Sequence, residues 1–183
     1  MKMLAVAAVL VLLVATGAFK FEFRWWTSSG ASNIPAAKDV NRLQDAGAAK
    51  SLEASTQNLA HMLDGINMNT AAGAAVLEHQ VPGVADRLAE QADELRLRLA
   101  AVRVDTPTGR LFRSVMTRGL LATRIMYRDF AAGAARHRTS RRAIRQWVQR
   151  YHVLQRWYAA QFQGVVQAAP PEDRAAVAAA LSS

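Results

Sequence analysis

Apolar residues recur at spacings of three and four along most of the chain, and this recurrence constrains the fold more than any other feature. The most regular run ends before residue 103 and comprises Leu77, Val81, Val84, Leu88, Ala92, Leu95, Leu99 and Val102. Such spacings place side chains on one face of an α-helix. Strict alternation of apolar and polar residues is confined to residues 19–25. The sequence therefore predicts an all-α fold.

Four segments with this pattern follow one another after short connections. The expected helices cover residues 36–63, 77–102, 107–135 and 141–168. Pro82 indicates a kink or a true start within the second. Pro107 suits the first turn of the third helix and Thr106 suits its cap, whereas Gly47 inside the first costs about 1 kcal/mol relative to alanine. Because each apolar stripe must be covered by another, we predict a four-helix bundle over residues 36–168.

The first 26 residues form an apolar segment with cationic edges. Residues 3–19 carry no charge, and a helix over them would reach about 26 Å, close to the thickness of a bilayer core. The residues expected at the membrane interface are Lys20, Arg24, Trp25 and Trp26. We predict that residues 1–26 are a transmembrane anchor. A signal peptide cleaved near residue 18 and a buried core helix are the alternatives.

The organisation after the anchor follows from composition. Residues 27–35 are small and polar and predict a flexible linker, and residues 169–183 predict a tail with a short helix after Pro171. A long domain after a short N-terminal segment is usually translocated, which favours an extracytoplasmic domain, secreted if the segment is cleaved. The chain has no cysteine, which excludes disulfides and Cys-ligated metals.

Charge divides the chain into two unlike parts. Residues 107–160 hold 12 Arg, no Lys and one acid, so their net charge is 12 − 1 = +11. Residues 36–106 hold 7 basic and 10 acidic residues, which gives 7 − 10 = −3. The arginines expected to form an anion- or partner-binding face are Arg138, Arg141, Arg142, Arg145 and Arg150. Their planar guanidinium groups suit phosphate and carboxylate oxygens.

Three interpretations of this basic half compete. Its arginines bind anionic lipid or an acidic protein partner next to the membrane, or they pair with the acids of the first two helices, or their number reflects a composition biased towards Arg and Ala. Nucleic acid is a weaker candidate, because the nearby aromatic residues fall on the predicted core stripe and export would remove this partner. The apolar stripes can also pair between chains, so a homo-oligomer is left open.

Candidate chemistry is sparse. The four histidines show none of the spacings typical of zinc or di-iron sites, and only His61, Met62 and Met68 form a weak candidate for a metal. No nucleophile elbow, phosphate-binding loop or dinucleotide motif is present. We therefore expect neither an enzyme nor a bound cofactor. We expect a membrane-anchored binding or scaffolding protein of the cell envelope, with a periplasmic small-ligand or metal-sensing bundle and a cytosol-facing nucleic-acid-binding protein as alternatives.

The predicted orientation can be tested with a C-terminal tag in a bacterial host. Because the domain is expected outside the cytoplasmic membrane, added protease should remove the tag in intact spheroplasts, as measured by immunoblot. A cytoplasmic marker that is degraded only after lysis is the control. A tag that survives until lysis would place the domain in the cytosol and contradict the prediction.

Overall fold

The computed structural model describes residues 33–47, 50–67, 70–135 and 141–182, and all regular structure in them is helical. The helices are α2 (Pro35–Ala46), α3 (Lys50–Gly65), α4 (Ala71–His79), α5 (Val81–Ala101), α6 (Pro107–Ala135), α7 (Arg141–Ala168) and α8 (Arg174–Ser182). The prediction of an all-α protein is confirmed. The interface residues Lys20, Arg24, Trp25 and Trp26 lie outside the described residues.

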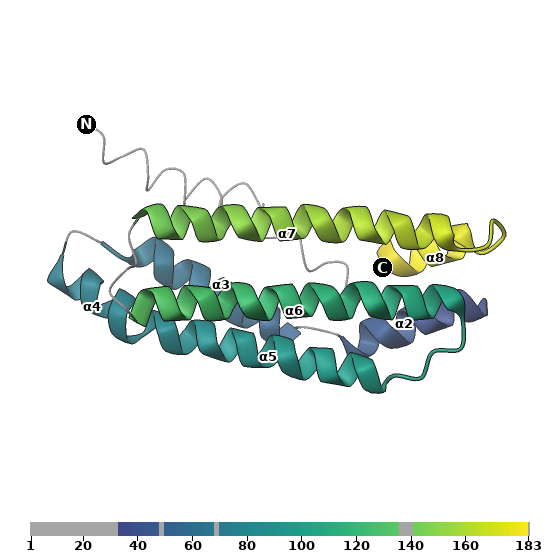
Figure 1. Cartoon of the computed structure of the whole chain (residues 1–183), viewed down its shortest axis with the longest axis horizontal. Coiled ribbons are helices and arrows are strands. Elements are labelled where there is room, and N and C mark those ends of the chain that lie inside the picture. Colours follow the sequence, from purple (N-terminus) through teal and green to yellow (C-terminus); the bar gives the residue numbers. More distant parts are fainter. Residues whose placement is uncertain (1–32, 48–49, 68–69, 136–140, 183) are drawn as a thin grey trace.

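Three long helices, α5, α6 and α7, lie side by side and make the molecule elongated (Figure 1). α6 occupies the middle and contacts α5, α7 and α2. α2 and α3 follow one another along the other side of α5 and α6. α8 folds back beside the end of α7 and contacts both α7 and α2. α6 therefore lies at the centre of the bundle, between α5, α7 and α2.

The first expected helix, 36–63, is wrong as a single element. Its two halves form α2 and α3, and α2 ends at Ala46, directly before Gly47. The Gly47 N–H still donates to the Leu43 carbonyl at 2.9 Å, but its backbone has left the helical conformation. Glycine loses more conformational freedom in a helix than any other residue, which explains why the break falls here.

The second expected helix, 77–102, begins later than predicted, because Leu77 belongs to the separate helix α4, whereas the last two expected helices agree with the structure. α5 begins at Val81 with Pro82 in its first turn, so the proline marks a true start, and α4 precedes it. α6 and α7 have the expected ends, and α8 is the short terminal helix. Thr106 caps α6, because the Gly109 N–H donates to its hydroxyl at 3.0 Å.

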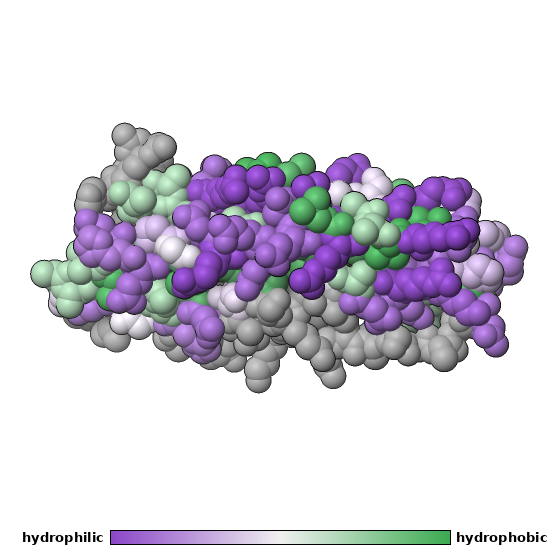
Figure 2. Space-filling view, turned by 90° about the horizontal axis from the view of Figure 1, so that it is seen from below, coloured by the Kyte–Doolittle hydropathy of each residue, from purple (hydrophilic) through white to green (hydrophobic). Residues whose placement is uncertain are grey.

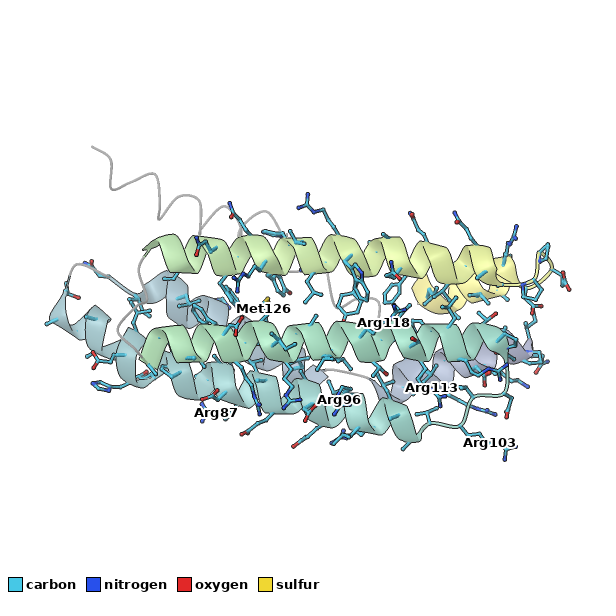
Figure 3. All side chains as sticks on the ribbon, in the orientation of Figure 1. Arg87, Arg96, Arg103, Arg113, Arg118 and Met126 are labelled. Atoms are coloured by element: carbon cyan, nitrogen blue, oxygen red, sulfur yellow. The ribbon has the colours of Figure 1, made fainter. Side chains whose placement is uncertain are left out.

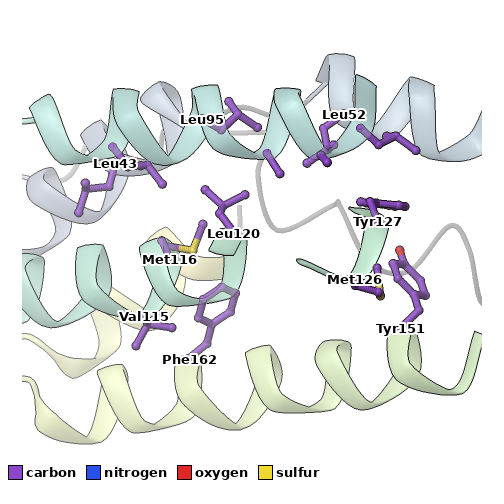
Figure 4. Close-up of a cluster of buried hydrophobic side chains, with 14 of the residues drawn as sticks. Leu43, Leu52, Leu95, Val115, Met116, Leu120, Met126, Tyr127, Tyr151 and Phe162 are labelled. Carbon is purple, nitrogen blue, oxygen red and sulfur yellow. The ribbon is translucent and has the colours of Figure 1, made fainter. Parts of the chain in front are cut away.

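The core follows the predicted apolar stripes (Figure 4). In α6, the apolar residues at spacings of three and four are buried: Phe112, Val115, Met116, Leu120, Met126, Tyr127 and Phe130. In α7, Leu154 and Tyr158 have the same spacing of three and four from the buried residues of the stripe but are only partly buried. The outward face of α5 is charged, and the view from below in Figure 2 shows a largely hydrophilic surface with hydrophobic residues in separate spots.

A buried carboxylate joins α2 to the start of α6. Asp39 is 1% exposed, and its Oδ2 accepts hydrogen bonds from the Asp105 N–H at 3.0 Å, the Thr106 N–H at 2.8 Å and the Thr106 hydroxyl at 2.7 Å. Gly109 permits this approach, since a Cβ there would lie 2.6 Å from the Asp39 side chain. Asp39 thereby satisfies backbone donors that precede the helix, in the manner of a cap supplied from another helix.

Among the described residues, no helix combines the length and the apolar character that crossing a membrane requires. The predicted anchor, residues 1–26, lies outside those residues.

Replacing Asp39 by alanine should lower the free energy of unfolding by about 2 to 3 kcal/mol, because three donors lose a charged acceptor. Urea unfolding followed by circular dichroism measures this change. Asp45→Ala is the matched control: Asp45 is an exposed carboxylate on the same helix, and its removal should change the stability by less than about 0.5 kcal/mol. Equal effects of the two substitutions would show that Asp39 has no special structural role.

Candidate functional site

Two aromatic clusters hold α7 against α6. Near the start of α7, Trp147 stacks on Phe130, with ring centroids 5.0 Å apart, and lies 6.0 Å from Tyr127. Near its end, Phe162 packs on Phe112 at 5.5 Å. Aromatic pairs at these separations add favourable geometry to the area that they bury. The spacing of the two helices is therefore fixed at both ends.

Tyr158 of α7 belongs to the second cluster and packs closely against α6. Its ring packs on Phe162 at 5.8 Å and covers Gly119, where an added Cβ would collide with the ring and its hydroxyl. Burial raises the pKa of Tyr158 well above its usual value, and a hydrogen bond with Thr123 offsets part of the effect. Tyr158 is thus neutral at physiological pH and acts as a packing group.

Tyr127 plays a similar part between α6 and α3. Its hydroxyl lies 3.0 Å from the Thr56 hydroxyl, which in turn donates to the Leu52 carbonyl at 2.7 Å. Burial raises the pKa of Tyr127 to about 12, with a smaller opposing effect of the Thr56 hydrogen bond. Neither Tyr127 nor Tyr158 is poised for proton transfer near neutral pH.

Between the two aromatic clusters, α6 and α7 border an open groove with a volume of about 750 Å³. Its apolar lining comprises Ala122, Met126, Val153, Leu154 and Trp157, and its polar lining comprises Arg118, Gln146, Gln149 and Arg150. Figure 3 shows Arg118 and Met126 between the two helices. Val153 is 57% exposed, so part of the apolar lining faces solvent. Its volume lies in the range of small-molecule sites, although the groove is open to solvent along its length.

A smaller hollow of about 140 Å³ continues from the groove towards the start of α7. The two share Met126, Gln146 and Arg150 in their linings. Arg150 reaches across from α7 to Asp129 of α6, with a nitrogen–oxygen distance of 3.4 Å. Trp147 also borders the hollow, and its buried Nε1 makes no hydrogen bond within the described residues.

The arginines near the groove differ in how their charge is compensated. Arg124 pairs with Asp93 of α5 at 3.3 Å, as expected if basic residues offset the acids of earlier helices. The hydrogen bond from Arg96, together with the charges of Arg124, Arg96 and Arg128, holds the pKa of Asp93 below its usual value. Arg118, in contrast, donates only to the Ser114 carbonyl at 3.3 Å and has no acidic partner among the described residues.

Of the five arginines predicted to form a binding face, only Arg150 has a side chain that the structure describes. Arg138 lies outside the described residues, and Arg141, Arg142 and Arg145 begin α7 with side chains that are likewise outside the description. Arg150 lies in the groove. The periodicity of the sequence did not single out Arg118, because its importance depends on the open space beside Leu154, which the stripe pattern assigned to the core.

Only two of the three residues of the weak metal candidate are described. His61 is exposed and Met62 is partly buried, while Met68 lies outside the described residues. In the part that the structure describes, no group of three histidine, aspartate or glutamate side chains is placed to hold a metal ion.

Comparison with protein-family models, with curated proteins and with solved structures returns no match for this chain. The function must therefore be inferred from the arrangement of its own residues.

Gly119→Ala should lower the free energy of unfolding by about 1 to 2 kcal/mol, because the new methyl group displaces Tyr158. Gly164→Ala is the matched control: nothing lies within 4 Å of a Cβ there, and alanine should stabilise α7 by up to about 1 kcal/mol. Chemical denaturation measures both. A Gly119→Ala protein as stable as the wild type would refute the close packing of Tyr158.

Proposed function

We propose that this protein is a membrane-anchored, extracytoplasmic four-helix bundle with a binding or scaffolding role in the cell envelope. In this proposal α2 and α3 together form one arm of the bundle, and α5, α6 and α7 form the other three. The basic surface of α6 and α7 binds anionic lipid or an acidic protein partner. Residues 1–26 hold the domain at the membrane.

The observation that carries the proposal is the uncompensated charge of α6 and α7. Their single acid, Asp129, is paired with Arg150. Arg118 and Arg156 have no acidic partner among the described residues, and both are exposed. Charges that are not needed for pairing within the fold remain available to an anionic partner.

Tethering makes lipid headgroups the nearest source of negative charge. A basic side chain near an anionic bilayer contributes about 1 kcal/mol to binding, and the contribution falls off within a Debye length. A cluster of arginines at the start of α7 therefore adds up to a substantial attraction. The same dependence predicts that binding weakens as salt is added.

Binding can be measured with the full chain held in nanodiscs of phosphatidylcholine. The binding partner is a vesicle that contains phosphatidylglycerol. Cosedimentation should be strong at low salt, and the reversal of Arg141, Arg142 and Arg145 to glutamate should abolish it while helicity, measured by circular dichroism, stays the same. Charge reversal on α7 acts directly on the surface that is proposed to bind.

The matched control reverses Arg87, Arg98 and Arg103 to glutamate, an equal change in net charge on exposed residues of α5 and the loop after it. This control should retain binding. Persistent binding after reversal on α7, or an equal loss in both variants, would contradict a specific role for the arginines of α7.

A further inference from the structure

We infer that the groove between α6 and α7 binds one long-chain fatty acid, with its carboxylate on Arg118 and its acyl chain along Ala122, Met126, Leu154 and Trp157. This inference rests on the proposed function, since a bilayer beside the domain would supply the ligand. It goes beyond the proposed function because it assigns one ligand molecule to a defined site, whereas the proposed function concerns binding to a membrane surface.

The lining of the groove fits an acyl chain. Met126, Leu154 and Trp157 supply apolar surface of different shapes, and the small side chain of Ala122 leaves room between them. Leu154 is only partly buried although it continues the core stripe of α7. A ligand that covers this apolar surface removes it from water, which lowers the free energy of the complex.

One end of the groove fits a carboxylate. Arg118 lies between the two helices (Figure 3), and its single hydrogen bond within the described residues, from Nε to the Ser114 carbonyl, leaves its terminal nitrogens available. A guanidinium group binds carboxylate oxygens through two parallel hydrogen bonds. Arg150, at the other end, is already paired with Asp129, so the charge favours one orientation of the ligand.

The smaller hollow extends the path available to the chain. From Arg118 to Gly133 the two hollows follow α6 for 133 − 118 = 15 residues, or about 22 Å. Phe130 and Trp147 continue the apolar lining beyond Met126. The length and lining together favour a single extended chain, without a second chain or a bulky headgroup.

Charge argues against a second copy of this protein as the occupant. In a two-fold symmetric dimer the same surfaces face each other, so the uncompensated Arg118 of one copy would face the same basic surface of the other. The Asp129 carboxylate is the only acid that borders the groove or its extension, among the described residues. An anionic ligand relieves this excess of positive charge, whereas a second copy increases it.

The test uses the full chain in phosphatidylcholine nanodiscs and a palmitate analogue that carries a photoactivatable diazirine near the end of its chain. After illumination, mass spectrometry should locate adducts in peptides that contain Met126, Trp147 or Leu154. Excess palmitate should suppress them, whereas hexadecanol, which lacks the carboxylate, should compete poorly.

Two variants separate the two halves of the site. Arg118→Gln should weaken palmitate labelling of the groove by about tenfold, the effect of losing one charge-assisted interaction. Ala122→Phe should abolish the labelling by filling the groove at an exposed position, without changing Arg118. Arg87→Gln on α5 is the matched control and should label like the wild type.

Adducts confined to residues 1–26, or equal labelling of the groove in all variants, would overturn the inference. So would a groove that takes up only an acidic amphipathic peptide and no palmitate. The vesicle assay distinguishes this failure from failure of the proposed function, because vesicle binding depends on Arg141, Arg142 and Arg145 and should survive Ala122→Phe.

Discussion

Asp39 belongs to α2, yet its hydrogen bonds go to Asp105 and Thr106, the two residues in front of α6. A carboxylate buried to this degree is costly unless donors surround it, and here three donors do. The Thr106 hydroxyl donates to Asp39 and accepts from the Gly109 N–H. The hydrogen bond from Thr106 to α2 and the cap of α6 therefore share this one hydroxyl group. The start of α6, the central helix, is thereby fixed relative to α2.

From that start, α6 runs along the centre of the bundle and packs against α5, α7 and α2. Its aromatic residues hold α7 at two levels, through Phe112 near the beginning and Phe130 near the end. Gly119 lets Tyr158 approach between these levels, whereas Ala122 leaves space unfilled. Closely packed cores rarely leave open apolar surface, and the groove beside Ala122 is such a surface between α6 and α7.

Most of the helical architecture could be predicted from the spacing of apolar residues, because a helix places every third or fourth residue on one face. α6 and α7 follow the prediction to their ends, and Thr106 caps α6 as expected. The break at Gly47 was harder to foresee. A glycine in a helix interior costs about 1 kcal/mol relative to alanine, and tertiary packing can offset a cost of that size. Whether the helix continues through Gly47 therefore depends on contacts with residues that are distant in the sequence.

The sequence by itself determined the helical class, the ends of α6 and α7 and the separation of acidic from basic segments, because these depend on local spacing and on the order of charges. The tertiary structure decided which arginines are compensated, that Asp39 reaches α6, and that Leu154 borders a groove although it lies on a core stripe. These features depend on distances between residues far apart in the chain, and helical periodicity carries no information about such distances.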